Sequence, residues 1–381
     1  MGGGIMTELE ALLTLNMLPK IGPVRVRRLI AQLGSAAAAL EAPADSLRRV
    51  EGIGTETAGI LRKWQDHADL GGELNRIREM GLTVVPLGSE LYPEPLTEIH
   101  DPPLVLYVRG KLEPRDRVAI GVVGSRRATS YGLTAARKLS FQLAHAGVTV
   151  LSGLARGIDT AAHEGAVASG GRTIAVIGSG MAHLYPPENA ALADRIADGR
   201  GAVVSEFPIL TEPDKQTFPQ RNRIVSGWSH GILVVEAPAW SGALITANNA
   251  ADQGRSVYAV PGPIDRASSL GCNKLIQNGA RLVLSAEDIL EDLNQLFPPS
   301  AAAAGGSGGG ASGSTPPAAA LVDLTDEESA LWQALGQEER QMDELIDATG
   351  LAASSVSVAL MRLELRRLVR QLPGRRYTRL V

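Results

Sequence analysis

The sequence predicts an α/β fold, in which a Rossmann-like, doubly wound parallel sheet is flanked by a helical module and a winged-helix-like domain. Short apolar runs alternate with helical stretches through the middle of the chain, as expected for successive βαβ units. The segment before this region reads as short helices. After a Gly- and Ala-rich stretch, helical periodicity resumes. We therefore expect a helical module over 7–75, a core over 80–297, a flexible linker over 298–320 and a winged-helix-like domain over 321–381.

Composition narrows the class of protein. The chain has 381 residues, enough for two or three domains, and a net charge of −4, so any grip on nucleic acid must come from local basic patches. Its one cysteine, Cys272, excludes an internal disulfide and a cysteine zinc site. No apolar run reaches the length of a membrane span and no secretory segment is evident, so we expect a cytoplasmic protein with no membrane partner.

The first module carries two glycine-containing turns between short helices, around Gly22 and around Gly52 and Gly54. This pattern resembles helix-hairpin-helix (SAM-like) units, whose backbone N–H groups meet phosphates at a helix N-terminus. The first turn is followed by Arg25 and its basic neighbours, whereas the second is flanked by acids. Phosphate binding and plain helical packing both remain open, and we favour packing.

The core is predicted from short, continuously apolar runs, which are typical of parallel strands buried on both faces. The expected strands are Val118–Val123, Val148–Ser152, Thr173–Ile177, Ala202–Ser205, Gly231–Glu236 and Val257–Val260, with Thr83–Leu87 and Leu104–Val108 ahead of them. A helix is expected over Leu133–Ala146, and Gly147 suits the left-handed position that ends it.

Polar turns follow these strands, and in an open α/β sheet they meet at the carboxyl edge. The string from Thr217 to Gly227 adds one aromatic ring and two arginines. Guanidinium groups form hydrogen bonds with phosphate oxygens, and aromatic faces stack on bases. The residue types at this edge therefore predict a binding site for single-stranded nucleic acid. The candidate single-stranded DNA ligands are Gly124, Ser125, Arg126, Arg127, Ser152, Gly153, Lys215, Phe218, Arg221, Asn222, Arg223, Ser241 and Gly242.

The same edge lacks a nucleophile–base pair, a metal cluster and a Walker lysine, so we expect no catalysis and no metal. Gly121, Gly124 and Gly132 do not have the dinucleotide-binding spacing, and we expect no cofactor. Glu206 and Glu236 lie near strand ends and leave a hydrolase open, although helix caps or salt links to the arginines are the favoured interpretation.

The last segment divides by charge at Gly350, with acids before it and arginines after it. A helix over 353–366 and a turn at Pro373-Gly374 place Ser354–Arg366 in the recognition position of a winged helix. DNA contact, protein contact and a structural role all remain open for this domain.

With these strings assembled, the chain resembles the bacterial DNA-processing protein A family (DprA, also called Smf). The matching strings include Val122 to Arg126, Ser152 to Asp159, Ser205 to Pro208, Phe218 to Ile224 and Ser241 to Ala247. The resemblance implies a non-enzymatic protein that binds and protects incoming single-stranded DNA during natural transformation and loads the recombinase RecA onto it. It also implies that Arg126, Lys215 and Phe218 form the pocket.

The resemblance further implies a homodimer joined through the core. A surface for it is suggested by Asn273 and by the helix that follows Gly271-Cys272-Asn273, where Leu275, Ile276 and Leu282 are apolar. Ordinary core packing explains these apolar residues equally well. Two other functions are weighed: a nucleotide-processing enzyme of the phosphoribohydrolase type and a non-enzymatic adaptor. The segment from Glu236 to Gly242 lacks the glycine run that such enzymes carry, which argues against the enzyme.

Overall fold

The computed structural model describes residues 6–296, 325–335, 340–352, 355–356, 359–360, 363, 368–372 and 376–379. The chain forms two compact units, Met1–Ser300 and Ala301–Val381. The predicted linker over 298–320 and the Pro373-Gly374 turn lie outside the described residues, as does most of the predicted recognition helix. No helix in the described ranges is long and apolar enough to cross a membrane.

The first unit begins with a helical module, which the sequence predicts. Its helices are α1 (Glu8–Met17), α2 (Pro23–Leu33), α3 (Ala36–Glu41), α4 (Ala44–Arg48), α5 (Thr55–Arg62) and α6 (Leu70–Glu79). A capping box between Thr7 and Glu10 starts α1, and Gly22 and Gly54 are the N-caps of α2 and α5.

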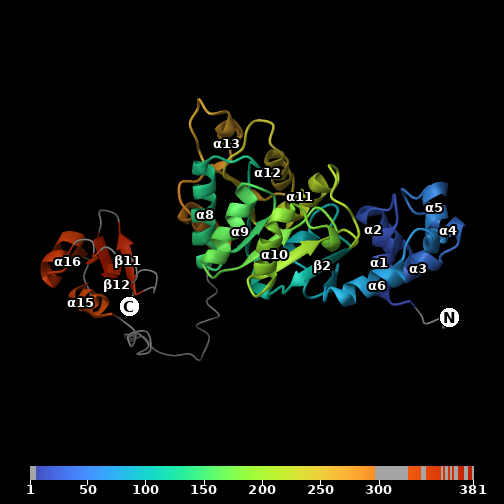
Figure 1. The fold of residues 1–381 in the computed structure, drawn as a ribbon, viewed down its shortest axis with the longest axis horizontal. Coiled ribbons are helices and arrows are strands. Elements are labelled where there is room, and N and C mark those ends of the chain that lie inside the picture. Colours follow the sequence, from blue (N-terminus) through green and yellow to red (C-terminus); the bar gives the residue numbers. More distant parts are fainter. Residues whose placement is uncertain are drawn as a thin grey trace. The chain divides into compact units, whose positions relative to one another are not determined.

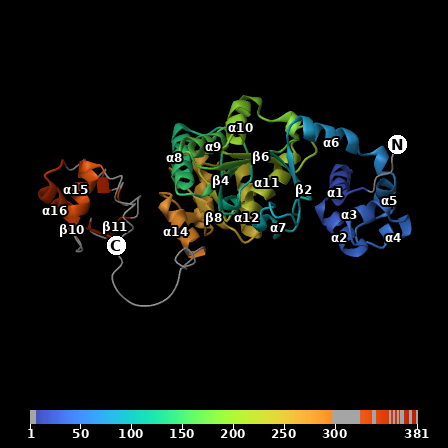
Figure 2. The same ribbon diagram turned by 90° about the horizontal axis from the view of Figure 1, so that it is seen from below.

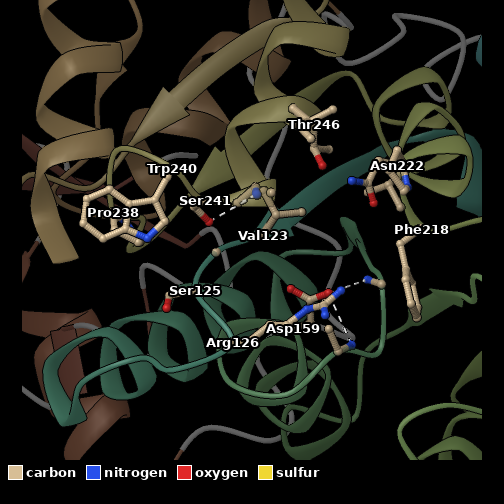
Figure 3. A pocket seen from close by; sticks show the side chains of 18 of the residues that line it. Val123, Ser125, Arg126, Asp159, Phe218, Asn222, Pro238, Trp240, Ser241 and Thr246 are labelled. Atoms are coloured by element: carbon tan, nitrogen blue, oxygen red, sulfur yellow. Dashed lines mark hydrogen bonds between the residues drawn. The ribbon is translucent and has the colours of Figure 1, made fainter. Parts of the chain in front are cut away.

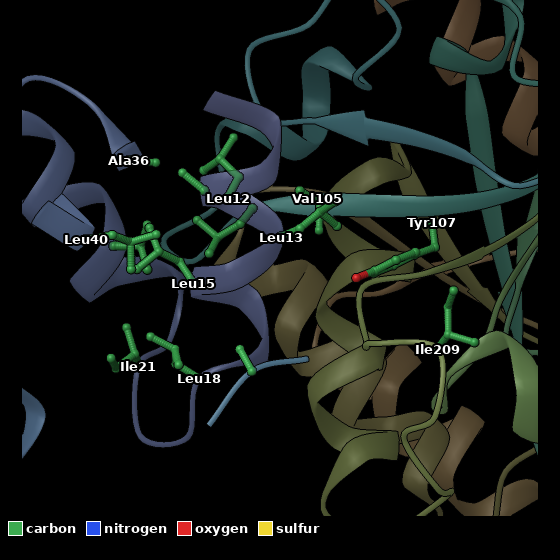
Figure 4. Close-up of a cluster of buried hydrophobic side chains, with 14 of the residues drawn as sticks. Leu12, Leu13, Leu15, Leu18, Ile21, Ala36, Leu40, Val105, Tyr107 and Ile209 are labelled. Atoms are coloured by element: carbon green, nitrogen blue, oxygen red, sulfur yellow. The ribbon is translucent and has the colours of Figure 1, made fainter. Parts of the chain in front are cut away.

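This module shares a hydrophobic cluster with the sheet. Leu13 of α1 lies beside Val105 of strand β2 (Val105–Gly110), and Tyr107 and Ile209 belong to the same cluster (Figure 4). Polar contacts add to this packing, because the buried carboxylate of Glu73 accepts a hydrogen bond of 2.9 Å from the backbone N–H of Ile209. The helical module and the sheet are therefore parts of one compact unit.

The core is a nine-stranded sheet in the order β1-β2-β6-β5-β4-β3-β7-β8-β9 (Figures 1 and 2). Its strands are β1 (Thr83–Pro86), β2 (Val105–Gly110), β3 (Ala119–Val123), β4 (Thr149–Ser152), β5 (Thr173–Val176), β6 (Gly201–Ser205), β7 (Gly231–Val234), β8 (Ser256–Ala259) and β9 (Arg281–Leu282). All neighbouring strands in the stretch β6-β5-β4-β3-β7-β8-β9 of this order pair in parallel, as predicted for the core. However, β1 and β2 pair in antiparallel fashion at one edge, and the short strand β9 was not predicted.

Alternate residues of each central strand enter different cores, which explains the continuous apolar runs. In β3, Ile120 and Val122 pack with α8 (Ser130–His145) and α9 (Ile158–Ala168). On the opposite face, Val123 packs with α11 (Thr217–Trp228) and α12 (Gly242–Asp252). Gly147 has φ of 89° just after α8, in the left-handed position predicted for it.

The order of the strands shows where in the sheet a ligand is expected to bind. From β3 the chain moves outward through β4, β5 and β6, and then α11 carries it back to β7 on the other side of β3. The carboxyl ends of β3 and β7 therefore flank a topological switch point, where ligands of open α/β sheets bind.

The second unit contains α15 (Asp326–Leu335), α16 (Met342–Thr349) and a three-stranded antiparallel sheet of β10 (Arg340–Gln341), β12 (Arg376–Arg379) and β11 (Val369–Leu372). Gly350, with φ of 66°, ends α16 in the left-handed conformation. Leu331, Leu345 and Leu363 are buried in its core. Two helices beside a small antiparallel sheet agree with the predicted winged-helix architecture.

Candidate nucleic-acid interface

A cleft of about 720 Å³ opens at the switch point (Figure 3). Its walls are the loop after β3, the turn after β4, the start of α11, and the turn between β7 and α12. Most of the candidate DNA ligands line it, so the sequence-based expectation that these turns meet at one edge is supported by the geometry.

Exposed cations stand on this cleft. Arg126 and Arg127 come from the loop after β3, and Lys215 comes from the segment before α11. The Arg126 guanidinium carbon lies 5.0 Å from the centre of the Phe218 ring, at cation–π distance. The cleft therefore presents positive charge beside an aromatic ring.

The Phe218 ring is held in place by its surroundings. A Cβ added at Gly178 would lie 2.8 Å from a ring carbon, so the ring needs a glycine beneath it. The preceding residue, Thr217, donates its hydroxyl hydrogen to the carbonyl oxygen of Gly178, which fixes the start of α11 against the end of β5. Phe218 is thus a half-buried ring on a rigid backbone.

Backbone groups complete the cleft. Ser241 is the N-cap of α12 and accepts a hydrogen bond from the N–H of Ala243, while the next position, Gly242, is exposed with open space around it. A helix N-terminus attracts anions through its free N–H groups and its dipole. Ser125 accepts a hydrogen bond from the N–H of Arg127, which orders the loop that carries Arg126.

Arg221 lines the cleft but has a structural role. It is 3% exposed, and it donates hydrogen bonds to the carbonyl oxygens of Gly153 and Val176, at the ends of β4 and β5. A Cβ at Gly153 would lie 2.5 Å from this guanidinium, so Gly153 contributes by making room for it. Burial lowers the pKa of Arg221 to about 10, and neighbouring Asp159 opposes the shift. Asn222, next to Arg221, is half-buried and also lines the cleft.

Two predicted ligands are placed away from the cleft. Ser152 is fully buried and donates its hydroxyl hydrogen to the carbonyl oxygen of Val122, 2.6 Å away. Arg223, whose side chain is 12% exposed, pairs with Asp101 and Glu206 on another side of α11. Both side chains bind other groups of the protein, so we no longer count Ser152 and Arg223 among the candidate DNA ligands.

The carboxylates near the cleft also accept hydrogen bonds from groups of the protein. Glu236 accepts hydrogen bonds from the backbone N–H and the hydroxyl of Thr129, at 3.0 and 2.9 Å. Asp159 accepts them from the N–H groups of Gly153 and Ala155, and burial raises the pKa of its carboxyl. Within the described part of the chain, no group of three or more His, Cys, Asp or Glu residues is arranged to hold a metal ion.

His163 and Cys272 are buried groups. His163 is fully buried, its Nδ1 lies 2.7 Å from the Thr173 hydroxyl, and burial lowers its pKa to about 3. Burial likewise raises the pKa of the Cys272 thiol to about 12. Neither group is poised for acid–base or nucleophilic chemistry at neutral pH.

Aromatic residues outside the predicted set stand around the cleft. Trp240, in the turn before α12, is 78% exposed and lines it. Behind Phe218, the ring of Tyr185 lies 5.8 Å away in a tilted arrangement, and the Arg156 guanidinium lies over Tyr185. An aromatic residue between a strand end and a helix N-cap is a signal that sequence inspection can find.

The predicted dimer residues divide into two kinds. Leu275 and Ile276 of α13 (Leu270–Gln277) are half-buried against the core, and Asn273 exchanges hydrogen bonds with the backbone of Gly262. Leu282 is exposed, and Leu284 two residues later is 76% exposed. Of the predicted dimer residues, Leu282 is therefore the exposed apolar one, and Leu284 is a second exposed leucine close to it in sequence.

The turns of the helical module carry ion pairs. Lys20 pairs with Glu56, and Arg28 pairs with Glu51, so acids of the second hairpin face bases of the first. These pairs are exposed and weakly stabilising. They reduce the positive charge available to a phosphate, which favours the packing interpretation.

Comparison with known proteins adds independent findings. The family model described as DNA recombination-mediator protein A matches residues 83–294, and the DprA winged helix domain matches 315–375. Protein Smf of Synechocystis sp. is 34% identical over 94% of this chain and 96% of its own length. DNA processing protein DprA of Bacillus subtilis is 44% identical over 57% of this chain and 73% of its own.

Solved structures agree with the fold. The X-ray structure of DNA processing protein A from Streptococcus pneumoniae superimposes with a TM-score of 0.66 and 33% identity, covering 76% of this chain and 99% of that one. DNA processing protein A from Helicobacter pylori, described for its single-stranded DNA binding mode, gives a TM-score of 0.51 and 25% identity over 57% of this chain and 99% of its own.

Proposed function

The chain belongs to the DprA (Smf) family of DNA recombination mediators, which are not enzymes, and from this we propose that it binds single-stranded DNA, protects it and loads RecA onto it during natural transformation. The proposal rests on one observation above all. Exposed cations and a fixed aromatic ring meet at the switch-point cleft, while its carboxylates are engaged in hydrogen bonds of the fold.

The mechanism follows from these groups. Phosphates of the strand meet Arg126, Lys215 and the N-terminus of α12, while a base stacks on Phe218. Stacking of this kind contributes about 1–3 kcal/mol per base and tolerates any base. The Helicobacter pylori relative, with its reported single-stranded DNA binding mode, supports the same ligand for this chain.

Protection and RecA loading extend this binding to long strands. Two copies joined at the apolar surface around Leu282 and Leu284 would present two clefts to one strand, and linked sites raise avidity. A strand held by its phosphates and a few bases keeps other bases open for a recombinase. We place this activity in the cytoplasm, where incoming DNA meets the recombinase.

The test is fluorescence anisotropy of labelled oligo-dT against a duplex of equal length, for the full chain and for the double variant Arg126→Ala/Lys215→Ala. We expect a salt-sensitive preference for the single strand that the double variant loses. Ser130→Ala, an exposed position at the start of α8 outside the cleft lining, is the matched control. Equal binding of single strand and duplex, or full binding by the double variant, would contradict the proposal.

RecA loading has its own readout. Strand exchange by RecA on DNA coated with single-strand-binding protein should be accelerated by the full chain and not by the double variant. Strong DNA binding without this acceleration would leave a DNA-binding protein that is not a mediator for that recombinase.

A further inference from the structure

Trp240 stands out among the exposed residues of the first unit. Its side chain is 78% exposed, whereas Trp228 is buried. A large ring left in water beside a charged cleft is typical of ligand-binding surfaces, because its apolar face is free to be covered. It lies in the turn Pro238 to Ser241, between β7 and the N-cap of α12.

The turn that carries Trp240 is anchored on both sides. The N–H of Gly271 donates to the carbonyl oxygen of Ala237 at 2.8 Å, and the N–H of Ser125 donates to that of Glu236 at 2.7 Å. Within the turn, the N–H of Ser241 donates to the carbonyl oxygen of Pro238 at 3.0 Å. The ring is therefore presented from a fixed backbone, which lowers the entropy lost when it is covered.

Trp240 and Phe218 lie on opposite sides of the same cleft. Figure 3 shows Trp240 beside Pro238 on one side and Phe218 on the other, with Ser241 and Val123 between them. In the same view Ser241, the N-cap of α12, lies between the two rings, and Arg126 lies below them. A helix N-terminus and a guanidinium group both attract phosphate.

We infer that Trp240 is a second base-stacking platform, so that a single strand crosses the cleft with one base on Phe218, another on Trp240 and the intervening phosphates on the N-terminus of α12 and Arg126. This inference rests on the proposed single-stranded DNA function and adds to it the path that the strand takes across the cleft, between Phe218 and Trp240. A base fits this position better than a protein partner does, because the ring shares its cleft with exposed cations and a helix N-terminus.

The test separates stacking from charge. Trp240→Ala should weaken oligo-dT binding on the order of tenfold, while Trp240→Phe, which keeps a ring, should lose much less. Because Trp240 carries no charge, the salt dependence of binding should stay that of the wild type, unlike in Lys215→Ala. Phe141→Ala is the matched control, since Phe141 is an exposed ring on α8 that lines a different groove.

Tryptophan fluorescence gives a direct readout in the full chain. Oligo-dT should quench the emission of the wild type, and Trp240→Phe should remove most of that quenching while retaining binding. Wild-type affinity in Trp240→Ala, or undiminished quenching in Trp240→Phe, would overturn the inference and leave the proposed function standing. Dissociation of the Trp240→Ala protein into monomers in sedimentation velocity would overturn it in favour of a subunit contact. Failure of the wild type to bind oligo-dT at all would refute both proposals.

Discussion

The cations around α11 should have separate roles in binding and in folding. Arg126, Arg127 and Lys215 are exposed on the cleft, whereas Arg221 and Arg223 are held by carbonyl and carboxylate groups. On single strands each neutralised phosphate contributes about −0.7 to the slope of log affinity against log salt. Three contacts in one cleft therefore give a slope near −2, or about an 18-fold loss of affinity between roughly 50 and 200 mM salt.

Removing two of the exposed cations should remove two thirds of this slope. For Arg126→Ala/Lys215→Ala we expect a slope that is smaller by about 1.4, so that the same salt change costs only about 2.6-fold in affinity. The measurement is anisotropy of labelled oligo-dT over a salt series.

The matched variant is Arg223→Gln. It breaks the ion pairs with Asp101 and Glu206 and leaves the buried Glu206 carboxylate without its counter-charge, at a cost of about 3 kcal/mol in unfolding free energy. We expect a lower thermal midpoint and an unchanged salt slope. The reasoning fails if Arg223→Gln flattens the slope as strongly as the double variant does, or if the double variant keeps the wild-type slope.

Four further results are expected. Gly178→Ala should displace the Phe218 ring and weaken oligo-dT binding several-fold at nearly unchanged thermal midpoint. Gly59→Ala, on α5 outside the cleft lining and with open space at its Cβ position, should leave binding unchanged; equal effects on binding would contradict this. Backbone N–H donors from Leu284 and Ser285 hold the pKa of Asp288 below its usual value, so its contribution is present at neutral pH and lost as pH falls through the lowered pKa. The loss of urea stability on acidification should therefore be smaller in Asp288→Asn, and an identical loss would exclude the role. Leu284→Glu should shift sedimentation velocity toward monomer, and an unchanged coefficient would place the subunit contact elsewhere. A chain ending at residue 300 keeps the whole first unit and should retain oligo-dT binding, unless the second unit supplies the main DNA contacts.

The sequence was informative wherever a local pattern has one physical explanation. Strands buried on both faces require continuous apolar runs, and Gly147 occupies a left-handed position that favours glycine, so both were predicted. The direction of β1 and β2 was not predicted, because an edge strand has the same local pattern whether it runs parallel or antiparallel to its neighbour.

The site residues were predicted by type but only partly by role. Residues two apart on a helix do not share a face, so Arg221 and Arg223 were never able to point into one cleft together. Phe218, Arg221 and Asn222, spaced three and four apart, do share a face and line it. That Arg221 is buried there, and that Trp240 is exposed, depends on packing between segments distant in sequence, which spacing alone does not reveal.

The contact between Arg126 and Phe218 has a consequence for which ligands the cleft accepts. In the free protein the guanidinium group covers the ring that a base has to reach, and a cation–π contact of this kind contributes about 0.5–1 kcal/mol at an exposed site. A lone base must displace the guanidinium and gives it nothing in return. A nucleotide offers a phosphate to the displaced guanidinium and a base to the vacated ring. Under the proposed function we therefore expect the cleft to discriminate against free bases and to favour ligands that carry a base and a phosphate together.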